Sequence, residues 1–268
     1  MAKKVAIAVV HGIGEQTPGF STSFIEKLTD FLNQYEDVDV ISKEICWQTQ
    51  VQPRENRLID KLDGMGWMKL RNLFINYGAD AIAYQPIEEN ASVYADVHKI
   101  YDISLKSLWR EADHQEIPLI IIAHSLGTVV TSNFLWDCFN KLSKAREIYE
   151  PSQVSHVMIK KNLKLIVTLG SPIAVWSLRY ENGGKSLKLP KDTKWLNIYS
   201  EYDVIGYPLT VINSDYCNNN GIEDMVMIVG GLLTRYTPVS HVEYMDDLKL
   251  IKVLAKEILL KLGGKDEQ

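Results

Sequence analysis

The segment Ile117–Phe134, which reads IPLIIIAHSLGTVVTSNF, decides how the rest of the chain is interpreted. Its first part is a short, continuous apolar run that ends at Ala123, which is typical of a strand buried on both faces of a sheet. The residues from Thr128 to Leu142 have the composition of a helix. The chain must therefore turn sharply between the two elements, and Ser125 lies at the apex of that turn.

Small residues surround this serine. Ala123 and Gly127 lie two positions before and after Ser125, and small side chains there allow the strained backbone of a tight turn. The turn lifts the hydroxyl clear of the sheet, and the start of the following helix offers backbone N–H groups to a developing negative charge. The pattern predicts a nucleophilic serine. The alternative is a structural serine at a strand–helix junction.

Further apolar runs predict strands that alternate with helices. The expected strands are Lys4–Val10, Val38–Trp47, Leu119–Ala123, Asn162–Pro172, Lys194–Asp203 and Asp224–Gly230. Helical spacing of apolar residues predicts helices after Ser21, which we expect to be an N-cap, and within 54–77, 89–115, 128–142 and 246–262. Alternating strands and helices favour a mostly parallel sheet that is covered on both faces.

The pentapeptide AHSLG resembles the nucleophile elbow of the α/β-hydrolase superfamily, which is usually written G-x-S-x-G, with Ala123 in place of the first glycine. The stretch VVHGIG (Val9–Gly14) follows the first strand and resembles the family's oxyanion loop. The resemblance implies that the N–H groups of Ile13 and Leu126 hold the oxyanion. Residues expected to support these two loops are His11, Gly12, Gly14, His124 and Gly127, with His11 hydrogen-bonded to backbone rather than catalytic.

The family's order of catalytic residues then points to an acid and a base. Asp203 follows a predicted strand in NIYSEYDVIGYPL, and Glu201 and Asp215 are its rivals. His241 lies in PVSHVEYMDD, in a loop before the last helix, and its surroundings resemble those of the catalytic histidine in lipase-like members. The remaining histidines are expected on surfaces or in structural positions: His98 and His114 on or beside a helix, His124 in the elbow, and His156 in a polar linker. TLGSPI (Thr168–Ile173) is expected to line or brace the site.

The resemblance implies a single α/β-hydrolase domain over residues 1–268, with a central sheet of about six strands flanked by helices. The family's usual two leading antiparallel strands have no counterpart before the first predicted strand. Residues 48–86 form an extended insertion with apolar residues at helical spacing. Such an insertion is expected to be either a lid over the acyl pocket or an ordinary helix packed on the core.

Composition limits the classes of partner. The net charge is −5, which disfavours a nucleic-acid binder, because phosphate contacts need a basic face. The three cysteines are far apart, so neither a zinc site nor a disulfide framework is expected, and we interpret them as reduced thiols of a cytoplasmic protein. No apolar stretch is long enough to span a membrane, and membrane contact is expected to be peripheral at most.

The sequence therefore predicts a cytoplasmic serine hydrolase that cleaves carboxylic esters, similar to lipases and carboxylesterases. Ser125 is the expected nucleophile, His241 the base and Asp203 the acid, and no metal or organic cofactor is expected. The partner is a small ester or lipid substrate, and the sequence does not indicate an oligomeric state. A thioesterase, an amidase, an acyltransferase or a catalytically silent binding protein of the same fold remain the alternatives.

Overall fold

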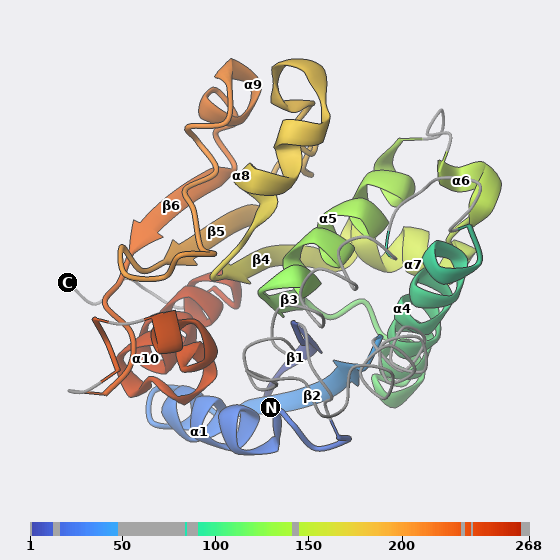
Figure 1. Ribbon diagram of the computed structural model, residues 1–268. Coiled ribbons are helices and arrows are strands. Elements are labelled where there is room, and N and C mark those ends of the chain that lie inside the picture. Colours follow the sequence, from blue (N-terminus) through green and yellow to red (C-terminus); the bar gives the residue numbers. More distant parts are fainter. Residues whose placement is uncertain are drawn as a thin grey trace, which may run out of the picture.

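The computed structural model describes residues 2–12, 17–47, 84, 91–140, 145–231, 234–236 and 238–263. Within these ranges, six strands form one sheet in the order β2-β1-β3-β4-β5-β6, and every neighbouring pair is parallel. The strands are β1 (Lys3–Val10), β2 (Val38–Ile45), β3 (Leu119–His124), β4 (Leu163–Leu169), β5 (Lys194–Tyr199) and β6 (Ile222–Val226). Figure 1 shows the twisted sheet with helices on both sides.

Helices cover both faces of this sheet. Those of at least twelve residues are α1 (Thr22–Asn33), α4 (Ala91–Glu111), α5 (Leu126–Phe139) and α10 (Leu248–Lys261). Shorter helical segments are α6 (Ala145–Ile148), α7 (Gln153–Val157), η3 (Met158–Asn162), α8 (Ile173–Trp176), η4 (Ser177–Arg179), η5 (Glu181–Gly183), α9 (Ser214–Cys217), η6 (Pro238–Val242) and η7 (Tyr244–Asp246). In Figure 1, α1 and α10 lie side by side on one face, and α4 and α5 lie on the other.

The alternation of side chains along β3 explains why this strand is apolar from Leu119 to Ala123. In β3, Leu119, Ile121 and Ala123 belong to the core beneath α4 and α5, whereas Ile120 and Ile122 belong to the core beneath α1 and α10. Successive side chains of a strand point to opposite faces, so a strand covered on both sides needs apolar residues at every position. The parallel sheet of six strands flanked by helices confirms the expected α/β class and strand number.

Two local predictions are wrong in detail. The last strand begins earlier than Asp224, because Ile222 pairs with Trp195, and it ends at Val226 rather than Gly230. Ser21 occupies the N-cap position of α1, but its side chain makes no capping bond, and its hydroxyl donates to Glu44 over 2.8 Å.

His98, which we expected on the surface, is fully buried in α4, where its ring packs 4.0 Å from that of Tyr94. His156 lies within α7 rather than in a linker. The expected insertion at 48–86 lies outside the described residues except for Tyr84, which is buried and contacts His98 Nε2 through its hydroxyl (2.7 Å). The interpretation of that insertion as a lid stays a prediction.

Candidate active site

The parallel register brings four loops together at the carboxyl edge of the sheet. Val10 of β1 pairs with Ala123 of β3, and Leu169 of β4 pairs with His124 of β3 and with Ile198 of β5. The residues that follow these strand ends are therefore neighbours, although they are far apart in the sequence. This is the edge at which open α/β sheets bind their ligands.

The turn between β3 and α5 has the strained backbone that the sequence pattern predicts. Ser125 has φ 53° and ψ −131°, a conformation that residues with a side chain rarely adopt. Its N–H donates to the carbonyl of Leu169 (2.9 Å), and its own carbonyl accepts from the hydroxyl of Thr128 (2.7 Å). The neighbouring strand and the first turn of α5 thus stabilise the strained residue on both sides.

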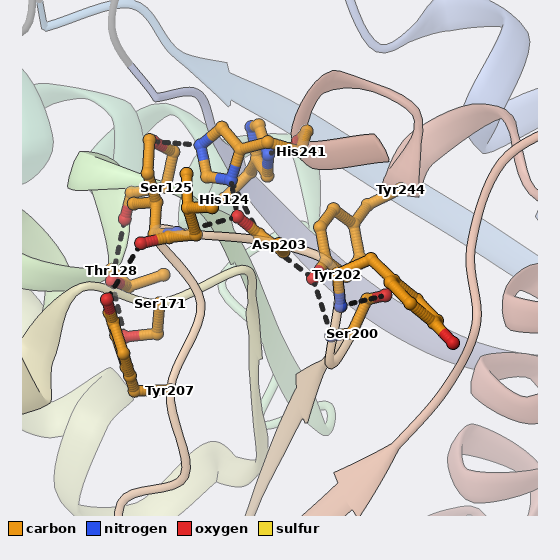
Figure 2. A network of polar contacts seen from close by, with 12 residues as sticks. His124, Ser125, Thr128, Ser171, Ser200, Tyr202, Asp203, Tyr207, His241 and Tyr244 are labelled. Atoms are coloured by element: carbon orange, nitrogen blue, oxygen red, sulfur yellow. Dashed lines mark hydrogen bonds and ion pairs between the residues drawn. The ribbon is translucent and has the colours of Figure 1, made fainter. Parts of the chain in front are cut away.

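The structure brings Ser125, His241 and Asp203 together in one chain of hydrogen bonds (Figure 2). The serine Oγ lies 2.8 Å from His241 Nε2, and His241 Nδ1 lies 2.9 and 3.0 Å from the two carboxylate oxygens of Asp203. A carboxylate only accepts, so Nδ1 carries the proton and Nε2 presents its lone pair to the serine hydroxyl. All three residues are buried, with exposed fractions of 1%, 6% and 4%.

Several donors converge on the carboxylate of Asp203. The N–H of Ile205 donates to Oδ1 and the hydroxyl of Tyr244 donates to Oδ2, each over 2.9 Å. Burial by itself raises the pKa of Asp203, but the hydrogen bond and charge of His241, with these two donors, hold the pKa below its ordinary value. The carboxylate is therefore ionised at neutral pH and can stabilise a positive charge on the imidazole.

Two glycines make room for this acid–base pair. A Cβ atom on Gly170, which has φ +54°, would lie 2.7 Å from Asp203 Oδ2 and 3.0 Å from His241 Nδ1. A Cβ atom on Gly206 would also lie 2.7 Å from Asp203 Oδ2. Gly170 belongs to the TLGSPI stretch, so this stretch borders the site, and Ser171 within it contacts the Thr128 hydroxyl over 2.9 Å.

His124, the residue before the serine, holds the loop that carries the base. Its Nε2–H donates to the backbone carbonyl of His241 over 2.7 Å, and the two rings lie 4.9 Å apart. Burial, together with the neighbouring His241, lowers the pKa of His124 to about 3. The ring is therefore neutral at physiological pH and acts as a hydrogen-bond donor.

The start of the predicted oxyanion loop packs directly on the elbow. His11 Nδ1 donates to the carbonyl of Gly12 (2.7 Å), and burial lowers the pKa of His11 to about 4. The buried indole of Trp47 stacks on the His11 ring at 5.4 Å and donates to the His11 carbonyl over 2.9 Å. A Cβ on Gly12 would lie 2.5 Å from Ser125 Cβ, so this backbone borders the serine. Ile13 and Gly14 lie outside the described residues.

The rival acids do not reach the site. Glu201 is exposed, and Asp215 accepts from the N–H of Ser186 over 2.7 Å, away from the histidine. Tyr244, whose role was not predicted, stands three residues after His241, the spacing at which two residues of a helical turn share a face. Its place in the HVEY segment (His241–Tyr244) is the signal from which its role could have been predicted.

No protein-family model matches the chain, and a search of curated proteins finds no relative. Among solved structures, the chain is similar to dienelactone hydrolase from Anabaena variabilis, with 12% identity over 97% of this chain and 86% of that chain and a TM-score of 0.43. Among the residues described here, no group of three His, Cys, Asp or Glu side chains is placed to hold a metal ion, and no helix is long and apolar enough to cross a membrane. Any functional inference therefore rests on the geometry of the site.

Proposed function

We propose that this protein is a serine hydrolase that cleaves carboxylic esters through an acyl-enzyme intermediate. The observation that carries the proposal is the continuous hydrogen-bond chain from Ser125 through His241 to Asp203, set on a strained elbow at the carboxyl edge of the sheet. Acyl transfer to a serine hydroxyl requires a base within hydrogen-bond distance of the nucleophile and an acid that orients the base, and this chain provides both.

In the first half of the proposed reaction, Ser125 Oγ attacks the ester carbonyl while His241 Nε2 takes the hydroxyl proton. Asp203 stabilises the imidazolium that forms, because its carboxylate already accepts the Nδ1–H. The carbonyl oxygen becomes an oxyanion, which the N–H groups of Leu126 and Ile13 are proposed to hold. The carbon–oxygen bond of the ester then breaks, and His241 returns the proton to the leaving alkoxide.

In the second half, His241 removes a proton from water, and the resulting hydroxide attacks the acyl carbon of the acyl-serine. The collapse of that intermediate releases the carboxylic acid and returns the proton to Ser125. His124 keeps the backbone of His241 fixed through both halves, since its donation to the His241 carbonyl does not involve either ring nitrogen of the base.

The test is covalent labelling followed by hydrolysis assays. Because Ser125 is buried, a compact sulfonyl fluoride and a long-chain fluorophosphonate should be compared. We expect mass spectrometry to place either adduct on Ser125, with labelling lost in Ser125→Ala and strongly slowed in His241→Ala. Ser23→Ala, a change at an exposed serine of α1, is the control and should label like the wild type.

A panel of p-nitrophenyl esters, acyl-CoAs and anilides then separates the alternatives. Hydrolysis of esters alone supports the proposal, whereas preference for acyl-CoAs or anilides would replace it with a thioesterase or an amidase. Transfer of the acyl group to an added alcohol in preference to water would indicate an acyltransferase. A folded wild type that neither labels nor hydrolyses any of these would identify a catalytically silent protein and refute the proposal.

A further inference from the structure

A cavity of about 300 Å³ lies outside the candidate active site, between α5 and the segment Ile173–Lys185. Its described walls include Val129, Trp136 and Ile173, with Tyr216 of α9, and none of the residues Ser125, His241 and Asp203 lines it. The volume is at the lower end of the range of about 300 to 1,000 Å³ that is usual for small-molecule sites. The largely apolar wall suits the body of a small organic ligand.

One hydrogen-bond donor in the wall has no partner among the described residues. Trp176 Nε1 is shielded from solvent and makes no hydrogen bond there. A buried donor without an acceptor costs free energy, and an acceptor supplied by a ligand would remove that cost.

The charge of the wall indicates which acceptor is suitable. Arg179 and Lys185 are the charged residues among the described lining, and no Asp or Glu is found there, although the whole chain has a net charge of −5. The Arg179 guanidinium lies 4.9 Å from the Trp176 ring and 4.6 Å from that of Tyr180, and it donates to the Tyr180 hydroxyl over 2.5 Å. No carboxylate of the described residues pairs with it.

We propose that this cavity is a binding site for a small apolar carboxylate, such as a medium-chain fatty acid. The carboxylate would lie against Arg179 and accept from Trp176 Nε1, and the hydrocarbon would lie against the apolar wall. An Arg guanidinium held by two rings is already oriented, so little side-chain freedom is lost on binding. The proposal does not depend on the proposed ester hydrolysis, because the site contains none of its reacting groups.

The test measures the binding of decanoate to the full-length protein carrying Ser125→Ala by titration calorimetry. Tryptophan fluorescence provides a second measurement, because Trp136 and Trp176 both line the cavity. Two compounds serve as controls: decanol has the hydrocarbon chain without the negative charge, and acetate has the negative charge without the long hydrocarbon chain. We expect decanoate to bind at least about tenfold more tightly than either, because both the charge-assisted hydrogen bonds and the apolar burial are needed.

Two variants locate the ligand. Arg179→Gln should weaken decanoate binding by about 10- to 100-fold through loss of a charged partner, and Trp176→Phe should weaken it by about 3- to 10-fold through loss of one N–H. Arg235→Gln is the matched control, since Arg235 also lies over a tyrosine ring (5.9 Å) but outside this cavity, and it should change nothing. Circular dichroism melting checks that each variant folds.

The proposal is overturned if decanoate and decanol bind equally, if no binding is seen at millimolar decanoate, or if Arg179→Gln and Trp176→Phe bind as the parent does. The last outcome would place decanoate elsewhere, including at the catalytic edge. The binding result is separate from the hydrolase test, because Ser125→Ala has no nucleophile and the labelling experiment does not use decanoate.

Discussion

Replacing Gly170 by alanine should disable the site while leaving the fold in place. Gly170 follows β4 with φ +54°, and its Cα lies against the acid–base pair. The added methyl carbon would be 2.7 Å from Asp203 Oδ2, 2.9 Å from Tyr244 Cε2 and 3.0 Å from His241 Nδ1. All three neighbours belong to the hydrogen-bond chain that is proposed to activate Ser125, so any relief of the overlap must move that chain.

The size of the effect follows from these distances. Ordinary contacts of a Cβ atom begin at 3.4 Å, so the Asp203 carboxylate and the His241 imidazole must each move away from the added methyl carbon by several tenths of an ångström. A misplacement of about 1 Å can lower a rate by about 100-fold, and we therefore expect kcat to fall by about 10- to 100-fold. The left-handed backbone adds a stability cost of about 1–2 kcal/mol for a residue with a Cβ atom.

The assay is steady-state hydrolysis of a p-nitrophenyl ester, with the free energy of unfolding measured in urea. Gly19→Ala is the matched control: Gly19 has φ +96°, and its nearest added contact is Thr22 Oγ1 at 3.5 Å, outside the site. The control should lose stability by a similar amount and keep its kcat. A folded Gly170→Ala protein with kcat within about twofold of the wild type would refute the inferred role of the Asp203–His241 geometry.

Four further predictions concern the same residues. Asp203→Asn should lower kcat by about 10⁴-fold in the ester assay, because an amide no longer favours the tautomer with the proton on His241 Nδ1. Tyr244→Phe removes one donor to the carboxylate, and it should lower kcat by about tenfold with KM little changed. His124→Phe removes the donor to the His241 carbonyl and should lower kcat by about tenfold, and His124→Gln, which keeps an N–H donor, should recover part of the loss. Burial lowers the pKa of His11 to about 4 from 6.5, so between these pH values the unfolded chain binds more protons than the native protein, and the free energy of unfolding must rise with pH. Urea unfolding should show that His11 lowers this free energy by about 2 kcal/mol at pH 5 relative to pH 7. His11→Asn should remove that part of the pH dependence.

The sheet and the serine elbow could be predicted because their signals are local. A parallel strand that is buried on both faces is apolar at consecutive positions, as β1 is over Val5–Val10 and β3 over Leu119–Ala123. The elbow needs small residues at fixed offsets from Ser125, which the sequence shows directly. The parallel order of the strands then places their carboxyl ends along one edge, so the residues that follow them were expected to meet.

The choice among polar residues could be predicted less well, because it depends on burial. Asp203 and Glu201 are two positions apart in one turn, and the structure separates them by burying the first and exposing the second. For His98 a signal was present: Tyr94, His98 and Tyr101 follow one another at spacings of four and three, which is the spacing of a buried helix face. A histidine on such a face is buried with its neighbours.

The elbow's departure from the G-x-S-x-G pattern shows that its two small positions have different physical requirements. Ala123 is the last residue of β3 that pairs with both neighbouring strands, opposite Val10 and Thr168, and its Cβ packs in the core beneath α4 and α5. A Cβ on Gly127, in contrast, would overlap the carbonyl oxygen of His11, which is the backbone that leads into the predicted oxyanion loop. Alanine is therefore accommodated at the first position, whereas glycine at the second is what allows the backbone of His11 to approach the start of α5.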